Sequence, residues 1–251
     1  MISSTFLAVP IAALLPIILL FYYIYHQDSN QPEPASQLWK GVIYGVASGI
    51  LVLVILSKYD VSTYIDNIAP SGIPRAIANA FLLAAIPEEA VKMYFIISLI
   101  RHNPYFDEHL DGIVYATCVG LGFAGFENLL YIFSNIDNLL TVALIRGIFS
   151  VPGHFFFAVA MGYFISLSHF SSTTKYDKTK NLILAFIVPV ILHGIFDMLL
   201  MIMATKESLV FVCFVLFLYF THRMRKEGCK RIFLLKKKDM MEAAEVVEEE
   251  V

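Results

Sequence analysis

The sequence predicts an all-α polytopic membrane protein in which about seven transmembrane helices surround a central polar cavity. The mean hydropathy of the 251-residue chain is +0.71, and only 16% of its residues are charged, whereas soluble domains carry about 25%. The apolar residues are concentrated in blocks of about twenty, the length of helix that crosses a hydrocarbon core. Ionisable side chains inside several of these blocks indicate the polar cavity.

Seven apolar blocks are the expected spans. We retain the first as a permanent anchor, because no basic residue precedes it and it ends in aromatic residues suited to a membrane interface. The fifth is too long for one straight span, and Pro152 is expected to break or kink it. The blocks cover roughly residues 5–25, 39–57, 76–100, 112–134, 139–168, 181–203 and 208–222.

The connecting loops are short, so residues 1–222 are expected to form one helical membrane domain. Residues 223–251 are expected to form a cytoplasmic tail. The tail is basic from Arg223 to Lys238, which suits contact with anionic lipid. It is acidic from Glu242 to Glu250, where we expect disorder or weak helicity.

Lysine and arginine residues predict the orientation in the bilayer. With seven alternating spans and a cytoplasmic C-terminus, 13 of these 18 residues lie inside and 3 outside, while Lys92 and Arg146 fall within spans. The positive-inside rule therefore predicts a multi-pass plasma-membrane protein with its N-terminus outside. The sequence contains no nucleic-acid-binding motif, and its three cysteines form no short-spaced metal motif.

Polar side chains lie inside four of the expected spans. A charged group at the centre of a spanning helix costs roughly 2.5–3.5 kcal/mol on insertion scales, so several of them should converge on one another or on a wet cavity. Arg146, near the outer end of its span, is expected to snorkel toward the interface. The other intramembrane polar residues are Glu88, Glu89, Lys92, Glu127, Asn128, His154, His193 and Asp197.

Helical spacing pairs some of these groups. Glu88 and Lys92 are four residues apart, as are His193 and Asp197, so each pair shares one helix face. Each pair also has a purely structural interpretation, as a neutralised ion pair or an interhelical polar contact. A stripe of small residues around Gly120 would allow close approach of a neighbouring helix.

The order and spacing of these residues resemble the PrsW family of intramembrane proteases. The resemblance extends from about residue 20 to residue 203. The matching segments are Pro32-Glu33-Pro34, Glu88-Glu89-x-x-Lys92, Asp111-Gly-Ile-Val-Tyr, Gly120-Leu-Gly-Phe-x-x-Phe-Glu127-Asn128, Gly153-His154 and His193-x-x-x-Asp197.

The resemblance implies peptide hydrolysis within the membrane, acting on single-span substrates such as anti-sigma factors. PrsW proteins are distantly similar to CAAX prenyl endopeptidases and Abi membrane proteins, in which a Glu-Glu pair and a histidine activate water and a later His-x-x-x-Asn pair stabilises the oxyanion. This sequence departs from that pattern at Glu127, which replaces histidine, and at Asp197, which replaces asparagine. His154 could supply the missing imidazole.

Two mechanisms follow from this resemblance. In the preferred one, Glu88 or Glu89 acts as the base, with Glu88 favoured through its partner Lys92. His193, oriented by Asp197, donates to the oxyanion, and Lys92 and Asn128 are the expected supporting groups for substrate or oxyanion. In the alternative, Glu127, His154 and His193 bind zinc and Glu88 remains the base.

Two further classes of function also need buried ionisable groups. One is a proton-coupled transporter, which usually contains an internal repeat that we do not find in this sequence. The other is a non-catalytic scaffold, in which the polar groups hold a partner helix.

Overall fold

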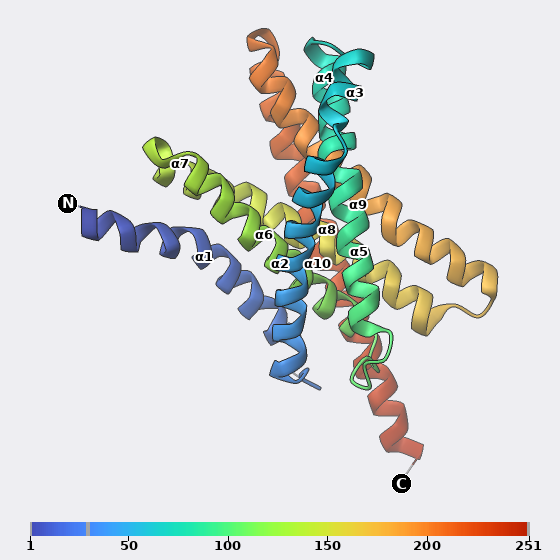
Figure 1. Cartoon of the computed structure of the whole chain (residues 1–251). Coiled ribbons are helices and arrows are strands. Elements are labelled where there is room, and N and C mark those ends of the chain that lie inside the picture. The colour runs from blue at the N-terminus through green and yellow to red at the C-terminus, as the bar shows by residue number, and fades with distance from the viewer. Residues whose placement is uncertain (1, 29–30, 250–251) are drawn as a thin grey trace.

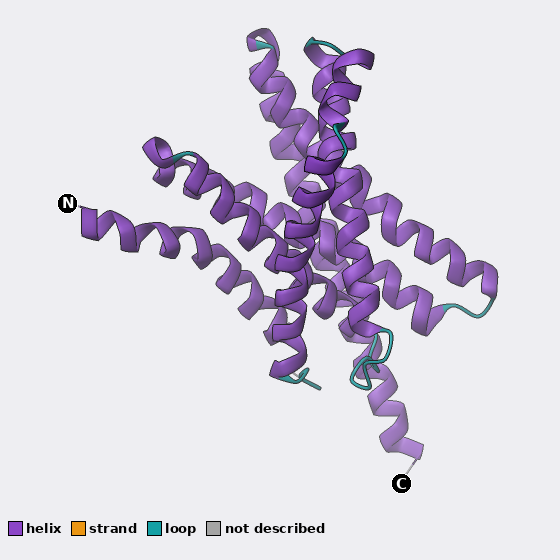
Figure 2. Cartoon of the chain, in the orientation of Figure 1, coloured by secondary structure: helices purple, strands orange, loops and turns teal. Residues whose placement is uncertain are grey.

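The structure is a computed structural model that describes residues 2–28 and 31–249. Every regular element in that part of the chain is helical, and short loops connect the helices (Figures 1 and 2). The longer helices are α1 (Ile2–Gln27), α2 (Ala35–Lys58), α5 (Ile86–Ile100), α6 (Asp111–Ser134), α8 (Val151–Ser166), α9 (Lys175–Thr205) and α10 (Val210–Glu249). The shorter ones are α3 (Val61–Ile68), α4 (Gly72–Ala78) and α7 (Leu139–Ile145).

Within the described residues, five helical segments are long and apolar enough to cross a membrane, which confirms the all-helical membrane class. They are Ala35–Lys58, Asp111–Ser134, Leu139–Ser171, Lys175–Thr205 and Glu207–Glu245. The first expected span lies in α1, whose Ala13–Gln27 portion is a shorter apolar helix, and the third is divided between α4 and α5. The count of seven spans therefore stays a prediction.

Helix α6 forms the centre of the bundle. It packs against α1, α2, α5 and α8, and it is the most buried of the five long apolar segments. Glycines allow the close approach: a Cβ on Gly122 would overlap the backbone carbonyl of Val42 in α2, and one on Gly120 would lie 2.6 Å from Cβ of Ala158 in α8. The small-residue stripe therefore does serve helix packing.

Two prolines are accommodated by wider helical turns. A π-helical segment, Asn79–Ala85, precedes Pro87, and another, Arg146–Ser150, precedes Pro152. Proline lacks an N–H and its ring clashes with the carbonyl four residues earlier, so the preceding carbonyls bond one residue further along. The fifth block consequently stays helical from Leu139 to Ser171 instead of breaking at Pro152.

The tail does not separate from the bundle. Helix α10 continues without interruption through the basic segment to Glu249, so the expected disorder or weak helicity of the acidic end is wrong as far as that residue. Near this end the carboxylate of Asp239 accepts hydrogen bonds from the backbone N–H groups of His109 and Leu110, at 2.8 Å each. This contact ties the tail to the loop before α6. The domain boundary at residue 222 stays a prediction.

Candidate active site

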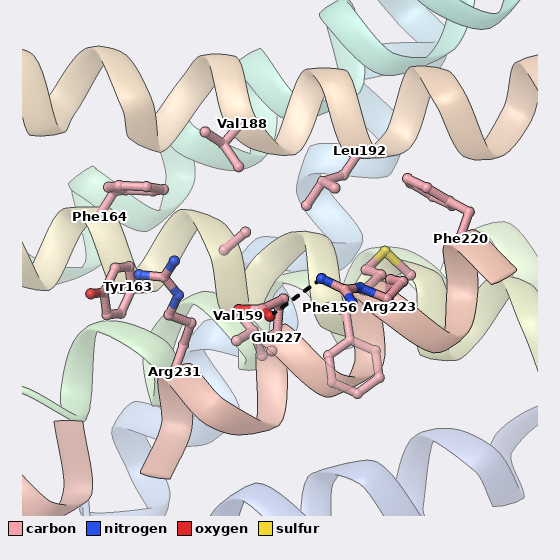
Figure 3. Close-up of a pocket in the computed structure, with 13 residues that line it drawn as sticks. Phe156, Val159, Tyr163, Phe164, Val188, Leu192, Phe220, Arg223, Glu227 and Arg231 are labelled. Carbon is pink, nitrogen blue, oxygen red and sulfur yellow. Dashed lines mark ion pairs between the residues drawn. The ribbon is translucent and has the colours of Figure 1, made fainter. Parts of the chain in front are cut away.

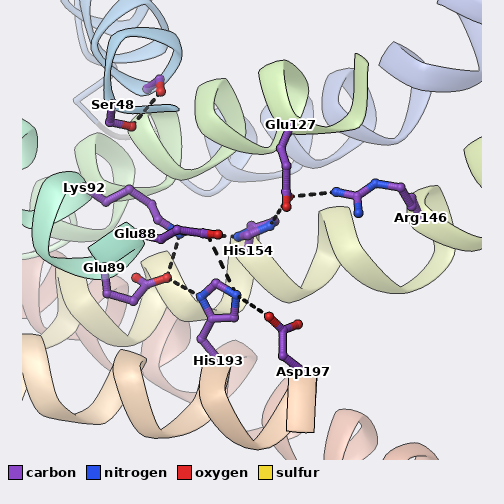
Figure 4. A network of polar contacts seen from close by, with 10 residues as sticks. Ser48, Glu88, Glu89, Lys92, Glu127, Arg146, His154, His193 and Asp197 are labelled. Carbon is purple, nitrogen blue, oxygen red and sulfur yellow. Dashed lines mark hydrogen bonds and ion pairs between the residues drawn. The ribbon is translucent and has the colours of Figure 1, made fainter. Parts of the chain in front are cut away.

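Four helices bring the predicted polar residues together in the bundle. Figure 4 shows Glu88, Glu89 and Lys92 on α5 facing His154 on α8 and His193 on α9, with Glu127 on α6 beside His154. The side chains of Glu88, Glu89, Lys92, His154 and His193 are all buried. The convergence predicted from the cost of isolated intramembrane charges is therefore found.

The two π-helical segments position the cluster residues of α5 and α8. Each wide turn ends just before the residues that enter the cluster, with Glu88 and Glu89 directly after Pro87 and His154 two residues after Pro152. π-Turns occur frequently at functional sites, because the extra residue changes which side chains face inward. The two proline turns thus determine the direction of the cluster side chains on α5 and α8.

A short network around Glu89 forms the middle of the cluster. Lys92 Nζ donates to Glu89 Oε1 at 2.6 Å, and His193 Nδ1 lies 2.9 Å from the same oxygen. Lys92 Nζ is also 3.4 Å from His154 Nδ1 and lies 4.2 Å from the centroid of the Phe123 ring. Lys92 is thus closer to Glu89 than to Glu88, its i+4 partner, from which it lies 3.6 Å away.

Glu88 occupies a different environment from its neighbour. Its Oε2 atom lies 3.6 Å from Lys92 Nζ and 3.9 Å from His193 Nε2, and it is buried without a hydrogen-bond partner among the described residues. A buried carboxylate oxygen without a partner is costly unless another group occupies the site during function. Glu88 is therefore held close to the cluster while one of its oxygens stays free to bind.

The Nε2 atom of each imidazole in the cluster contacts a carboxylate outside the Glu89–Lys92 pair. His154 Nε2 lies 2.7 Å from Glu127 Oε2, and His193 Nε2 lies 3.4 Å from Asp197 Oδ2. The Nδ1 atoms of both rings face the Glu89–Lys92 pair instead. Carboxylate–histidine pairs of this kind orient the ring and fix its tautomer, as they do behind catalytic metals.

Arg146, whose position in the sequence predicts contact with the membrane interface, is part of the site. Its Nη2 donates to Glu127 Oε2 at 2.7 Å, its Nε donates to Asn128 Oδ1 at 3.2 Å, and its guanidinium group stacks on the ring of Tyr131. Arg146 therefore points inward, and the interface expectation is wrong. Arg146 is the only arginine inside an expected span. Because a carboxylate buried in the membrane needs a counter-charge, Glu127 is the signal in the sequence that could have identified Arg146 as its partner.

Asn128 takes part in a structural contact instead of the cluster. Its amide nitrogen donates to the backbone carbonyl of Ala13 at 2.9 Å, and its oxygen accepts from Arg146. The side chain thereby connects α6 to α1 and helps to hold Arg146. Both groups of the amide are already in use.

Two pockets reach the cluster. One, of about 250 Å³, is lined by Glu127, Arg146, His154, His193 and Asp197. The other, of about 310 Å³, is lined by Glu88 and shares Glu127, Tyr131 and Met201 with the first. A third, between α8, α9 and α10, contains no predicted site residue (Figure 3). A single central cavity stays a prediction.

The donor set suits a catalytic divalent metal. Glu88, Glu89, His154 and His193 each place one ligand atom within 4.8 Å of the others. Two imidazoles with carboxylates form a set typical of catalytic zinc sites. The Glu88 oxygen that makes no hydrogen bond and the carboxylates behind both rings are consistent with such a site. The Lys92 ammonium group presently supplies positive charge to this set.

Comparison with known proteins identifies the family. A family model described as "PrsW family intramembrane metalloprotease" matches residues 33–221. The chain is 33% identical to Protease PrsW of Clostridioides difficile over 211 residues. This aligned region covers 82% of this chain and 85% of that protein.

Other relatives carry the same name. The chain is 35% identical over 190 residues to Protease PrsW of Oceanobacillus iheyensis, covering 75% of this chain and 81% of the relative. It is 30% identical over 189 residues to that of Bacillus subtilis, with the same two shares. No solved structure matches the chain. This multi-pass membrane protein therefore belongs to the PrsW family and is an intramembrane protease.

Proposed function

We propose that the protein hydrolyses peptide bonds of membrane-anchored substrates with water activated by Glu88. Two observations carry this assignment: Glu88 lines a pocket beside the cluster, and its buried Oε2 atom makes no hydrogen bond among the described residues. An amide carbon is a poor electrophile, so the attacking water needs a base and the resulting oxyanion needs donors. Glu89 is already engaged by Lys92 and His193, so it is a positioning group rather than the base.

The remaining groups receive roles from their contacts. If no metal is bound, His193, held by Asp197, would donate to the oxyanion as its charge develops. Arg146, which lines the same pocket as His193, would supply a second donor in place of Asn128, whose amide is in use. Glu127 would orient His154 through the 2.7 Å contact to its Nε2 atom.

We further propose that the enzyme depends on a divalent metal, in keeping with the description of its family. Glu89, His154 and His193 would hold the metal through groups that already face one another, while Glu88 stays free as the base. Glu127, which the sequence analysis placed among the ligands, contacts the opposite nitrogen of His154. A metal such as zinc, when bound, supplies Lewis acidity and lowers the pKa of water.

A metal-free mechanism is the second candidate. The observation that favours it is the 2.6 Å ion pair between Lys92 and Glu89, because an ammonium group there already neutralises the carboxylate. In this version His154 and His193 act only as proton-handling groups and hydrogen-bond donors. The two candidates share Glu88 as the base and differ in whether a metal is required.

Metal analysis separates the two candidates. We expect protein purified in mild detergent to contain about one zinc per chain, and chelation to lower substrate cleavage at least 100-fold until zinc is restored. The measurement is elemental analysis together with a cleavage assay, with His102→Gln as the control because His102 is exposed and outside the cluster. A metal-free preparation whose cleavage rate is unchanged by chelators would support the second candidate.

The substrates are proposed from the family resemblance to be single-span membrane proteins of the anti-sigma-factor type. The orientation proposed for the enzyme, with seven spans, an outside N-terminus and a cytoplasmic C-terminus, rests on the distribution of its lysines and arginines. Neither a proton-coupled transporter nor a non-catalytic scaffold is supported by membership in a protease family.

A further inference from the structure

A second group of carboxylates lies at the opposite end of α6 from Glu127. Asp28 follows α1, Glu108 belongs to the loop between α5 and α6, and Asp111 begins α6. One ligand atom from each of these three residues lies within 4.8 Å of the other two. Asp111 and Glu127 are sixteen residues apart on one helix, or about 24 Å at 1.5 Å per residue. This group is therefore separate from the proposed active site.

Hydrogen bonds fix two of these carboxylates and leave one oxygen of each free. Asp28 Oδ2 accepts from the backbone N–H of Glu33 at 3.1 Å. Asp111 Oδ2 accepts from the N–H groups of Asp107 and Glu108, at 2.9 and 2.7 Å. The second oxygen, Oδ1, of both Asp28 and Asp111 is buried with no hydrogen-bond partner among the described residues. Asp28 is only 2% exposed to solvent and Asp111 only 1%.

The charge of the group is not balanced. Within residues 2–28 and 31–249, Asp28, Glu108 and Asp111 form no ion pair with a lysine, arginine or histidine. Burial, together with the charges of Glu33, Glu108 and Asp239, raises the pKa of Asp28 to about 7. Burial and the neighbouring carboxylates likewise raise the pKa of Glu108 to about 7. A cation would relieve both the repulsion and the unpaired oxygens.

The loop that carries Glu108 is held in place from two sides. The backbone N–H of Glu108 donates to Asp111, and the next two N–H groups donate to Asp239 of α10. The adjacent Glu33 accepts a hydrogen bond from the buried hydroxyl of Tyr115 on α6. The ligand-bearing segments are therefore positioned before any ligand binds, which lowers the entropic cost of binding.

We propose that Asp28, Glu108 and Asp111 bind one hard divalent cation, and that Ca²⁺ is preferred because its coordination is the more flexible. Hard cations take carboxylate and carbonyl oxygens as ligands. Ca²⁺ accepts about six to eight oxygen ligands in flexible geometry, whereas Mg²⁺ demands near-ideal octahedral geometry. The bound cation would connect the end of α1 to the start of α6.

The test is calorimetric titration of the full-length protein in detergent with CaCl₂ and, separately, with MgCl₂. We expect one Ca²⁺ per chain, weaker binding of Mg²⁺, and a higher unfolding temperature when Ca²⁺ is saturating. Asp28→Asn combined with Glu108→Gln should weaken Ca²⁺ binding at least tenfold. This double variant should still fold, because it removes two charges that repel their neighbours and keeps the side-chain sizes.

Two single variants serve as controls. Glu245→Gln changes an exposed carboxylate of the tail, and Glu88→Gln changes the proposed base; both should bind Ca²⁺ as the wild type does. Loss of Ca²⁺ binding in Glu88→Gln would overturn the proposal by placing the cation at the active site. Equal affinity of the double variant and the wild type, or no Ca²⁺ binding by the wild type, would overturn it as well.

Discussion

Replacing Glu88 with glutamine is expected to lower substrate cleavage by about 10²–10⁴-fold, the usual contribution of a positioned general base. Glutamine keeps the size of the side chain but cannot accept the proton of the attacking water. The packing should be little affected, because Oε2 of Glu88 makes no hydrogen bond and the variant loses only the longer ion-pair contacts to Lys92 and His193, at 3.6 and 3.9 Å. The measurement is immunoblotting of single-span membrane proteins co-expressed with each variant.

Glu207→Gln is the matched control for this experiment. It makes the same chemical change at an exposed position in the turn before α10, far along the chain from the cluster. We expect it to cleave as the wild type does. Normal cleavage by Glu88→Gln, with equal amounts of folded protein in the membrane, would remove Glu88 from its proposed role.

Replacing His193 with glutamine is expected to abolish zinc binding and to lower cleavage by more than about 100-fold. Loss of a residue that only orients a metal ligand typically costs 10–100-fold, and His193 is proposed as a ligand itself. Its Nδ1 atom is 2.9 Å from Glu89, and its ring is stacked on Phe157 at 4.8 Å between centroids. Zinc content and cleavage rate should be measured on the same preparation.

Asp197→Asn provides a graded comparison with that variant. Asp197 contacts the other nitrogen of His193, at 3.4 Å, so its loss should reduce zinc affinity and cleavage by about 10–100-fold without abolishing either. If Asp197→Asn were as inactive as His193→Gln while retaining all of its zinc, the proposed division between ligand and orienting group would be wrong.

The convergence of the ionisable residues could be predicted from the sequence, because burying a charge alone in the membrane is costly. Isolated carboxylates and histidines in lipid are too costly, so Glu88, Glu89, Glu127, His154 and His193 had to meet. Their convergence is found. The family could also be identified from the order of its motifs, since the matched region of 33–221 includes nearly all of them.

Details of pairing could not be obtained from spacing alone. The i+4 rule pairs Lys92 with Glu88, but its closest carboxylate is Glu89, at i+3, because His193 from another helix approaches that oxygen as well. The inward direction of Arg146 depends on a π-turn that begins at this residue. A one-residue change in helical bonding shifts the direction of a side chain, and periodicity does not reveal it.

The tail illustrates a different limit. Its composition, basic and then acidic, is typical of a solvated or disordered segment. In the structure it continues a long apolar helix, and Asp239 accepts hydrogen bonds from a loop 129 and 130 residues earlier in the chain. Such long-range capping is decided by tertiary contacts, so the local sequence does not predict it.

Sequencing of protein N-termini tests the central claim most directly. Membranes from cells that express the wild type would be compared with membranes from cells that express Glu88→Gln at the same level. A buried cluster that activates water predicts new N-termini within or beside the spans of single-span proteins, present with the wild type and missing with the variant. Identical sets of N-termini in the two membranes would contradict intramembrane hydrolysis by this cluster.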